Sequence, residues 1–187
     1  IENATGEKYK DLLKTKIFIP LGMHNSSASY AEIINADNVA LPHRYKWGKY
    51  IPEAISENYY SVLPAAGVNA SISDMGKWLV AMMGNSEHVI SDSILNQVFN
   101  PVIDTYKRKK ISSYNWKNLK KASYAMGWRV YYTKNDTIIY HGGLVNNYRS
   151  EIAFSKRYKI GICVFANAPS KLTLLSVPDF FEIWNKS

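Results

Sequence analysis

The sequence predicts an α+β domain, with helices in its first half and a mainly antiparallel sheet with a closing helix in its second. Three observations predict this order. Apolar residues recur at helical spacing in the first half, they alternate at a spacing of two from Ser123 onward, and turn-forming residues separate the later segments. We expect one domain with a helical and loop part (1–103), a basic linker (104–122), and a sheet with a terminal helix (123–187).

The composition fits one substantial core, since 47% of the 187 residues are hydrophobic and 13% are aromatic. Cys163 is the single cysteine and lies in an apolar run, so we predict a buried thiol and no disulfide framework. His24, His43 and His88 lack metal-ligand spacing, and we predict neither a metal site nor a cofactor. No apolar run reaches the roughly 20 residues that a membrane-spanning helix needs.

The formal net charge of +8 is concentrated between Lys107 and Lys121, where Tyr106, Tyr114 and Trp116 are interleaved with lysines. Basic residues with aromatics can bind nucleic-acid single strands. No nucleic-acid-binding module accompanies them, so we predict a solvated, lysine-rich loop and no nucleic-acid partner. The same surface would also suit anionic polymers or lipid headgroups.

The first helix is predicted from four apolar residues on one face, and Pro20 should end it because a residue before proline leaves the helical region. Residues 24–63 are expected to be mostly connection, with a short helix near residues 30–34. A loop of this length tends to form a binding wall or a lid. The turn signals within it are Pro42, Gly48 and Pro52.

Two further helices are predicted before the linker. Ser71 or Ser73 should cap the first of them, and Gly84 should end it. Its apolar stripe is expected to comprise Ile72, Met75, Leu79, Met82 and Met83. Ser91 should open the second helix, which ends near Pro101. Its inward residues are expected to be Ile94, Leu95, Val98 and Phe99.

The sheet is predicted to begin with one half-buried strand, whose alternating residues are Tyr124, Met126, Trp128 and Val130. Asn135-Asp136 should then form a hairpin turn, and further strands follow in residues 137–168. Pro178 is expected to begin a final helix. That helix should cover one sheet face with Phe180, Phe181 and Trp184.

His141-Gly142-Gly143 is the triplet around which the second half is organised. Two adjacent glycines leave a strand without side chains, so another backbone can approach its N–H and C=O groups. We therefore predict an edge that grips an amide-containing substrate, with the titratable ring of His141 beside it. The alternative is a bend or close packing, which is the more frequent meaning of such a triplet alone.

The triplet and the segments after it resemble the C-terminal sheet of the serine β-lactamase and penicillin-binding-protein superfamily, and most of all its class C-like branch with esterase and peptidase relatives. The later matching segments are Asn147-Tyr148-Arg149-Ser150-Glu151-Ile152-Ala153-Phe154 and Gly161-Ile162-Cys163-Val164-Phe165-Ala166-Asn167. Earlier landmarks resemble the same family in the same order. They are Thr5-Gly6, Pro20-Leu21-Gly22-Met23, Tyr45-Lys46-Trp47-Gly48-Lys49 and residues 64–75.

The resemblance implies roles for the triplet, which corresponds to the third active-site motif of the family. His141 would stand where a lysine or histidine supports proton shuttling, and the backbone N–H of Leu144 would be one oxyanion donor. Gly143 would leave room for substrate. Gly142 replaces the usual threonine, whose hydroxyl helps to hold a substrate carboxylate, so weaker carboxylate binding is expected.

Three neighbouring positions also depart from the family pattern or leave alternatives open. Asn147 stands where glycine is frequent. Arg149 either pairs with a substrate acid or forms a surface salt bridge. Ala66 stands where class C enzymes usually carry tyrosine, which would widen that wall of the cleft.

The family's nucleophile and base lie in Ser-x-x-Lys, which is followed by Tyr-x-Asn or Ser-x-Asn. The chain contains no Ser-x-x-Lys, and Ser113-Tyr114-Asn115 lies out of order, which indicates a coincidence. The resemblance therefore implies the C-terminal half of a domain that is incomplete at its N-terminus. Its partner would be an N-terminal segment carrying both motifs, without which this chain would not be catalytic.

With that segment, the expected activity is hydrolysis of β-lactam, peptide or ester substrates through an acyl-enzyme, in the periplasm or cell envelope. The alternative is a non-catalytic module of the same fold that binds peptide or cell-wall material. In either case the sheet would keep an unpaired edge, and a partner segment or a dimer would be needed to cover it.

Overall fold

A computed structural model describes residues 1–105, 116 and 119–185, and it has the predicted order of helices followed by a sheet and a helix. The first part contains α1 (Glu2–Thr5), α2 (Tyr9–Leu13), the π-helix η1 (Lys14–Phe18), β1 (Ser26–Ser27), α3 (Tyr30–Ile34), β2 (His43–Lys46), β3 (Lys49–Pro52), the 3-10 helix η2 (Asn58–Val62), α4 (Leu63–Ala66), β4 (Asn69–Ala70), α5 (Ile72–Val80), the π-helix η3 (Ala81–Asn85) and α6 (Asp92–Val98). The second contains β5 (Ile103–Asp104), β6 (Lys121–Tyr124), β7 (Arg129–Tyr132), β8 (Thr137–Val145), β9 (Tyr148–Ser155), β10 (Ile160–Ala166) and α7 (Lys171–Trp184).

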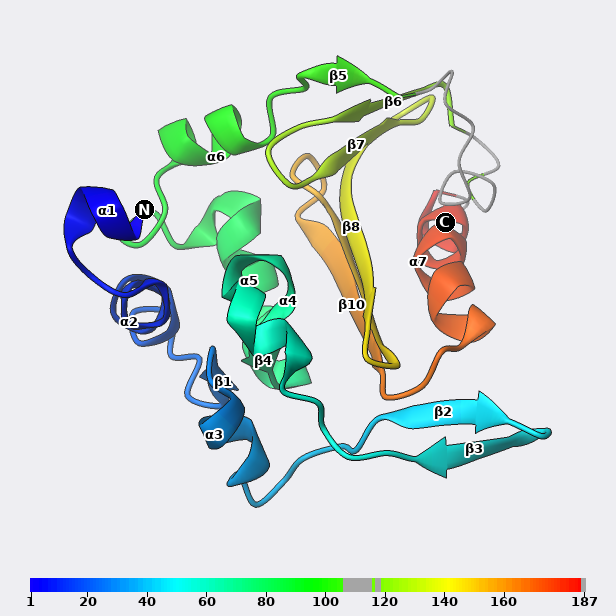
Figure 1. The fold of residues 1–187 in the computed structure, drawn as a ribbon. Coiled ribbons are helices and arrows are strands. Elements are labelled where there is room, and N and C mark those ends of the chain that lie inside the picture. Colours follow the sequence, from blue (N-terminus) through cyan, green and yellow to red (C-terminus); the bar gives the residue numbers. More distant parts are fainter. Residues whose placement is uncertain (106–115, 117–118, 186–187) are drawn as a thin grey trace.

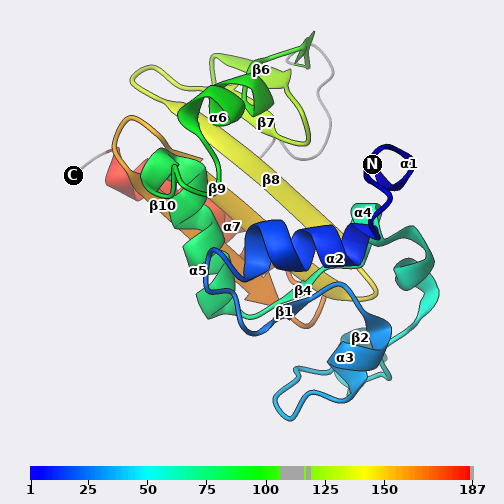
Figure 2. The same ribbon diagram turned by 90° about the vertical axis from the view of Figure 1, so that its left-hand side faces the viewer.

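The main sheet has six antiparallel strands in the order β10-β9-β8-β7-β6-β5. Helix α7 lies on one face of this sheet, and α5 lies on the other (Figure 1). In the view turned by 90°, α2 and α5 stand in front of the sheet and β8 runs behind them (Figure 2). We call the two sides of the sheet the α5 face and the α7 face. Because side chains alternate along a strand, neighbouring residues of β8 point to opposite faces.

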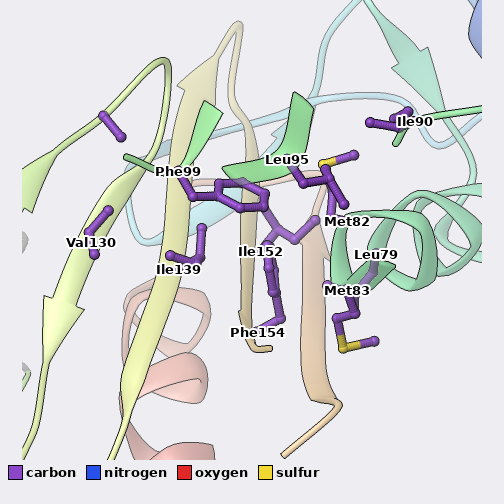
Figure 3. Close-up of a cluster of buried hydrophobic side chains, with 11 residues drawn as sticks. Leu79, Met82, Met83, Ile90, Leu95, Phe99, Val130, Ile139, Ile152 and Phe154 are labelled. Carbon is purple, nitrogen blue, oxygen red and sulfur yellow. The ribbon is translucent and has the colours of Figure 1, made fainter. Parts of the chain in front are cut away.

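The core on the α5 face joins α5, η3 and α6 to the sheet (Figure 3). Phe99 packs edge-on against Trp128 and Phe154, with ring centroids 5.6 and 5.4 Å apart. The buried residues of this cluster are Leu79, Met82, Met83, Ile90, Leu95, Phe99, Ala125, Val130, Ile139, Ile152 and Phe154. Two residues of the predicted stripes are instead about half exposed, Ile72 at 52% and Ile94 at 51%. Both lie in the first turn of their helices, before the apolar face meets the sheet.

The core on the α7 face includes Trp116, which lies within the predicted linker. Trp116 is 8% exposed, and its ring lies 5.2 Å from that of Tyr131 and 6.1 Å from that of Phe181. This residue therefore belongs to the core rather than to a solvated loop. The run of basic residues at 107–110, Lys117 and the Ser113-Tyr114-Asn115 match lie outside the described residues.

Two elements of the second half differ from their predictions. The single strand predicted around residues 123–130 is a hairpin of β6 and β7, because Gly127 takes a left-handed φ of 78° and turns the chain. Helix α7 begins after Ser170, whose Oγ accepts a hydrogen bond from the Leu172 N–H, so Pro178 lies inside the helix instead of starting it. Burial of Val177 and Phe181 on either side of this proline offsets the helical hydrogen bond that it removes.

The long connection of residues 24–63 contains the predicted helix α3 and an unpredicted hairpin of β2 and β3. The hairpin turns at Trp47 and Gly48, which both have positive φ angles, of 52° and 76°. It extends away from the sheet and helices (Figure 1). Among the described residues, no helix is long and apolar enough to cross a bilayer.

Candidate active site

The candidate site is the part of β8 that β7 does not cover. Strand β7 pairs with β8 only up to Tyr140, opposite Arg129, whereas β9 pairs with β8 as far as Val145. On the side away from β9, residues 141–145 therefore have no strand partner among the described strands. We call this stretch the free edge of β8. It is the kind of edge that the glycine pair predicted, and an extended substrate can pair with it.

The direction of the backbone groups along this edge follows from the turn that joins β8 to β9. Val145 pairs with Tyr148 around a two-residue turn, Asn146-Asn147, in which both residues have positive φ angles, of 44° and 65°. The pair that flanks such a turn exchanges both of its hydrogen bonds, and the next pair exchanges none. The N–H and C=O groups of Leu144, and by the same alternation those of Gly142, therefore point away from β9 to the free edge.

His141 lies on the α5 face, at the start of the free edge. Its ring is half-buried and lies edge-on to Trp128, with ring centroids 6.3 Å apart. Burial lowers the pKa of His141, and the positive charge of Arg129 lowers it further. The imidazole is therefore held in its neutral form near pH 7, in which one nitrogen accepts a hydrogen bond and the other donates one.

The two glycines of the triplet have different surroundings. A Cβ atom on Gly143 would lie 3.4 Å from the nearest atom, the Oγ of Ser150, so this position is nearly open. A Cβ atom on Gly142 would lie 2.0 Å from Oε2 of Glu151 and 2.7 Å from the Tyr140 hydroxyl. The packing alternative therefore holds at Gly142, whereas Gly143 has the bare face that a substrate backbone needs.

Arg149 lies opposite Leu144 and forms an ion pair with Glu151, at 2.9 Å between Nη1 and Oε1. The side chain of Arg149 is 17% exposed and that of Glu151 is 1% exposed, so this pair is not the surface salt bridge that was one of the two alternatives. The Tyr140 hydroxyl donates to the other oxygen of Glu151 at 2.5 Å. Burial, and then this hydrogen bond, raise the pKa of Tyr140.

Asn147 anchors the turn beyond the free edge. Its side-chain amide donates to Oε2 of Glu53 at 2.8 Å, and Glu53 also pairs with Arg44 at 2.8 Å. This contact connects the β8–β9 turn to the end of β3, so the long connection lies beside the site, as a binding wall would. The side chain of Leu144 is 50% exposed.

Sequence reasoning missed Glu151, Tyr140 and Arg129 as parts of this site. The one local signal was a charged residue, Glu151, in the middle of an apolar strand pattern. Asp74, in the first turn of α5, accepts hydrogen bonds from the Asn25 N–H at 2.7 Å and from the Ser26 hydroxyl at 2.9 Å. Burial would raise the pKa of Asp74, but these bonds and the Lys77 ammonium lower it overall.

Two other kinds of site bear on the assignment within the part of the chain that the structure describes, namely metal sites and pockets. No group of three or more histidine, cysteine or acidic side chains gathers there in a way that could hold a metal ion. A hollow of about 680 Å³ is lined by Asn96, Pro101, Lys134, Asp136, Lys156 and Arg157, among others. It opens at the opposite end of β8 from Leu144 and contains neither His141 nor the glycines, so we do not assign the chemistry to it.

The fold and the free edge define a protein of the β-lactamase type. A family model described as Beta-lactamase matches residues 1–175, and the chain belongs to this family. The chain is 32% identical over 186 residues to Beta-lactamase-like protein 4 of Dictyostelium discoideum, covering 94% of this chain and 29% of that protein. The family is therefore not limited to bacteria.

Solved structures share the fold at lower sequence identity. The octameric penicillin-binding protein homologue from Pyrococcus abyssi superimposes with a TM-score of 0.75 at 22% identity, covering 97% of this chain and 39% of that chain. A class C beta lactamase from Rhodobacter sphaeroides gives 0.69 at 15% identity, covering 99% and 56%. The predicted superfamily and fold are confirmed, and the chain spans less than a third of the Dictyostelium relative.

Proposed function

We propose that this chain is part of a serine hydrolase that acts through an acyl-enzyme on β-lactam, peptide or ester substrates. Its membership of the β-lactamase family supports the reaction class. The observation that carries the proposal is the free edge of β8, with its outward N–H groups next to His141. In this proposal the chain supplies the wall that receives the substrate, and a further segment supplies the serine.

The chemistry of acyl transfer explains why such an edge is needed. When a nucleophile attacks a carbonyl group, negative charge develops on the oxygen, and N–H donors aimed at that oxygen lower the barrier. The Leu144 N–H would be one donor, and the N–H of the nucleophilic serine the other. His141, held neutral, would exchange a proton with the group that activates the serine.

Substrate binding would use the same strand edge. An extended amide would pair with the outward groups of Gly142 and Leu144 as an additional strand, and the bare face of Gly143 would let its backbone come close. Gly142 has no side-chain hydroxyl to offer a substrate carboxylate, and Glu151 occupies the space in which a side chain at this position would begin. We therefore expect weaker carboxylate binding than a threonine at this position would give.

The proposal is tested on a longer protein that contains these 187 residues together with the segment before them. We expect that segment to carry Ser-x-x-Lys followed by Tyr-x-Asn, and we expect the protein to be labelled covalently by a fluorescent penicillin or to hydrolyse a chromogenic ester. Changing the serine of Ser-x-x-Lys to alanine should abolish both signals. A longer protein without these motifs, or one that neither labels nor hydrolyses, would contradict the proposal.

A non-catalytic peptide-binding module is the second candidate, because the 187 residues contain no Ser-x-x-Lys. The same free edge would then hold a peptide by strand addition alone. The two candidates separate in one experiment, since a binding module would bind a peptide, as measured by calorimetry, without releasing product or forming an adduct.

A further inference from the structure

A buried cluster of Glu151, Tyr140 and Arg149 lies directly behind the free edge of β8, on the α7 face. We infer that Glu151 is a positioning residue that fixes the outward N–H groups of Gly142 and Leu144. The inference rests on the proposed function, because it assigns Glu151 a role in the acyl-transfer site. Glu151 itself faces away from the substrate side and acts through the strand.

Glu151 fills the space beside Gly142. Glu151 lies opposite Gly142 across β8 and β9, and its Oε2 occupies the place of a side chain at residue 142, only 2.0 Å from where a Cβ atom would stand. The carboxylate has little freedom to move, since it is 1% exposed and is bonded at both of its oxygens, to the Tyr140 hydroxyl and to Arg149. Gly142 and Glu151 are therefore matched in size: a larger side chain at residue 142 would require a smaller one at residue 151.

The cluster also lies where the free edge of β8 begins. Its partners are spread along the strand pair, because Tyr140 directly precedes His141 and Arg149 lies opposite Leu144. The bond from the Tyr140 hydroxyl to Glu151 thus connects β8 to β9 where β8 loses β7 as its second neighbour, and the ion pair of Arg149 with Glu151 lies along β9 opposite residues 142–144. A strand with a single neighbour is held less firmly, and this bond, whose acceptor is fixed by the buried ion pair, supplies a contact on the α7 face.

Aromatic rings and the Arg129 guanidinium enclose the Tyr140 side of the cluster. The Tyr140 ring lies 5.5 Å from that of Tyr131 and 5.8 Å from that of Trp116, and the Arg129 guanidinium lies 5.4 Å from the Tyr140 ring centre. Because the hydroxyl is fixed by these neighbours, its bond to Glu151 fixes the carboxylate as well. A change at Glu151 is therefore transmitted to the strand rather than absorbed by a loose side chain.

The first test measures catalysis in the longer protein. Glu151→Gln keeps the size of the side chain but removes its charge, so the bonds to Arg149 and Tyr140 weaken and the Leu144 N–H loses its fixed position. We expect kcat to fall by about tenfold with little change in KM, because misplacing a donor by a fraction of an ångström affects the transition state most. Glu87→Gln, the same change on an exposed residue, should leave both constants unchanged. An unchanged kcat in Glu151→Gln would overturn the inference.

The second test changes the size of the side chains at residues 142 and 151 and measures thermal stability, so it needs no catalytic activity. Gly142→Ala should lower the melting temperature of the longer protein by several degrees, whereas Gly143→Ala, with its open surroundings, should lower it much less. Glu151→Asp, which retracts the carboxylate, should be destabilising alone but stabilising when added to Gly142→Ala. Equal effects of the two alanine variants, or no such rescue, would overturn the inference.

The two tests separate this inference from the proposed function. A wild-type protein that neither labels nor hydrolyses rejects the proposed function, while the melting temperatures still decide whether Gly142 and Glu151 are matched. An active wild-type protein with an unchanged Glu151→Gln variant rejects the positioning role alone.

Discussion

At the residue scale, the proposed acyl transfer depends on one backbone group, the N–H of Leu144. Leu144→Pro removes this N–H, and the alternation of hydrogen bonds in β8 means that no bond to β9 is lost with it. We expect acylation of the longer protein by a chromogenic β-lactam or ester to slow by about 100-fold, the size of effect seen when one oxyanion donor is removed.

Leu144→Ala is the matched control, since it truncates the same half-exposed side chain and keeps the N–H. It should acylate at close to the wild-type rate. If the alanine variant slows as much as the proline variant, the side chain rather than the N–H is what matters at this position.

His141 makes a second prediction at this scale, in the pH dependence of stability. Its pKa in the folded protein is below the value of about 6.5 that it has in an unfolded chain, so the unfolded state binds more protons as the pH falls through about 6.5. The free energy of unfolding should therefore decrease from pH 7 to pH 5. In His141→Gln this part of the decrease should disappear, and denaturant unfolding at the two pH values measures it. An equal decrease in both proteins would show that other groups cause it.

At the element scale, the signals that the sequence carried best were local. The α3 helix, the serine caps at Ser71 and Ser91 and the turn at Asn135-Asp136 each depend on a few adjacent residues, and each appears where it was predicted. The prediction that Pro178 begins the last helix was wrong, because burial of Val177 and Phe181 in the core allows a proline inside the helix. The β2–β3 hairpin was not predicted, although its turn at Trp47 and Gly48 is a local feature. The bond from Tyr140 to Glu151 could not be predicted from local signals, because it requires the register of β8 against β9.

The β8–β9 turn makes a prediction for one element. Asn147→Gly and Asn147→Ala both lose the bond to Glu53, but only alanine is strained at a φ angle of 65°. We expect the alanine variant to be less stable than the glycine variant by about 1 kcal/mol, measured by urea unfolding. If the two variants are equally stable, the bond to Glu53, and not the left-handed backbone, explains why residue 147 is asparagine.

At the scale of the whole molecule, the main sheet ends at β10, the last strand in its order. Its outer edge pairs with no other strand that the structure describes, and Phe165 on this strand is 37% exposed. Residues 1–187 alone should therefore self-associate through this edge, as unprotected edges do. Light scattering at increasing concentration measures the association.

Phe165→Lys should reduce this association, because a lysine on an edge strand disfavours strand addition. Leu172→Lys, on an exposed position of α7, adds the same charge away from the edge and should leave the association unchanged. A chain that stays monomeric at every concentration would show that the β10 edge needs no cover.

The most direct test of the central claim is a crystal structure of the longer protein trapped as an acyl-enzyme with a slowly hydrolysed β-lactam. We expect the acyl carbonyl oxygen to lie roughly 2.7–3.1 Å from the Leu144 nitrogen, with the substrate along the free edge of β8. A carbonyl oxygen turned away from Leu144, or a free edge covered by another segment of the longer protein, would contradict it.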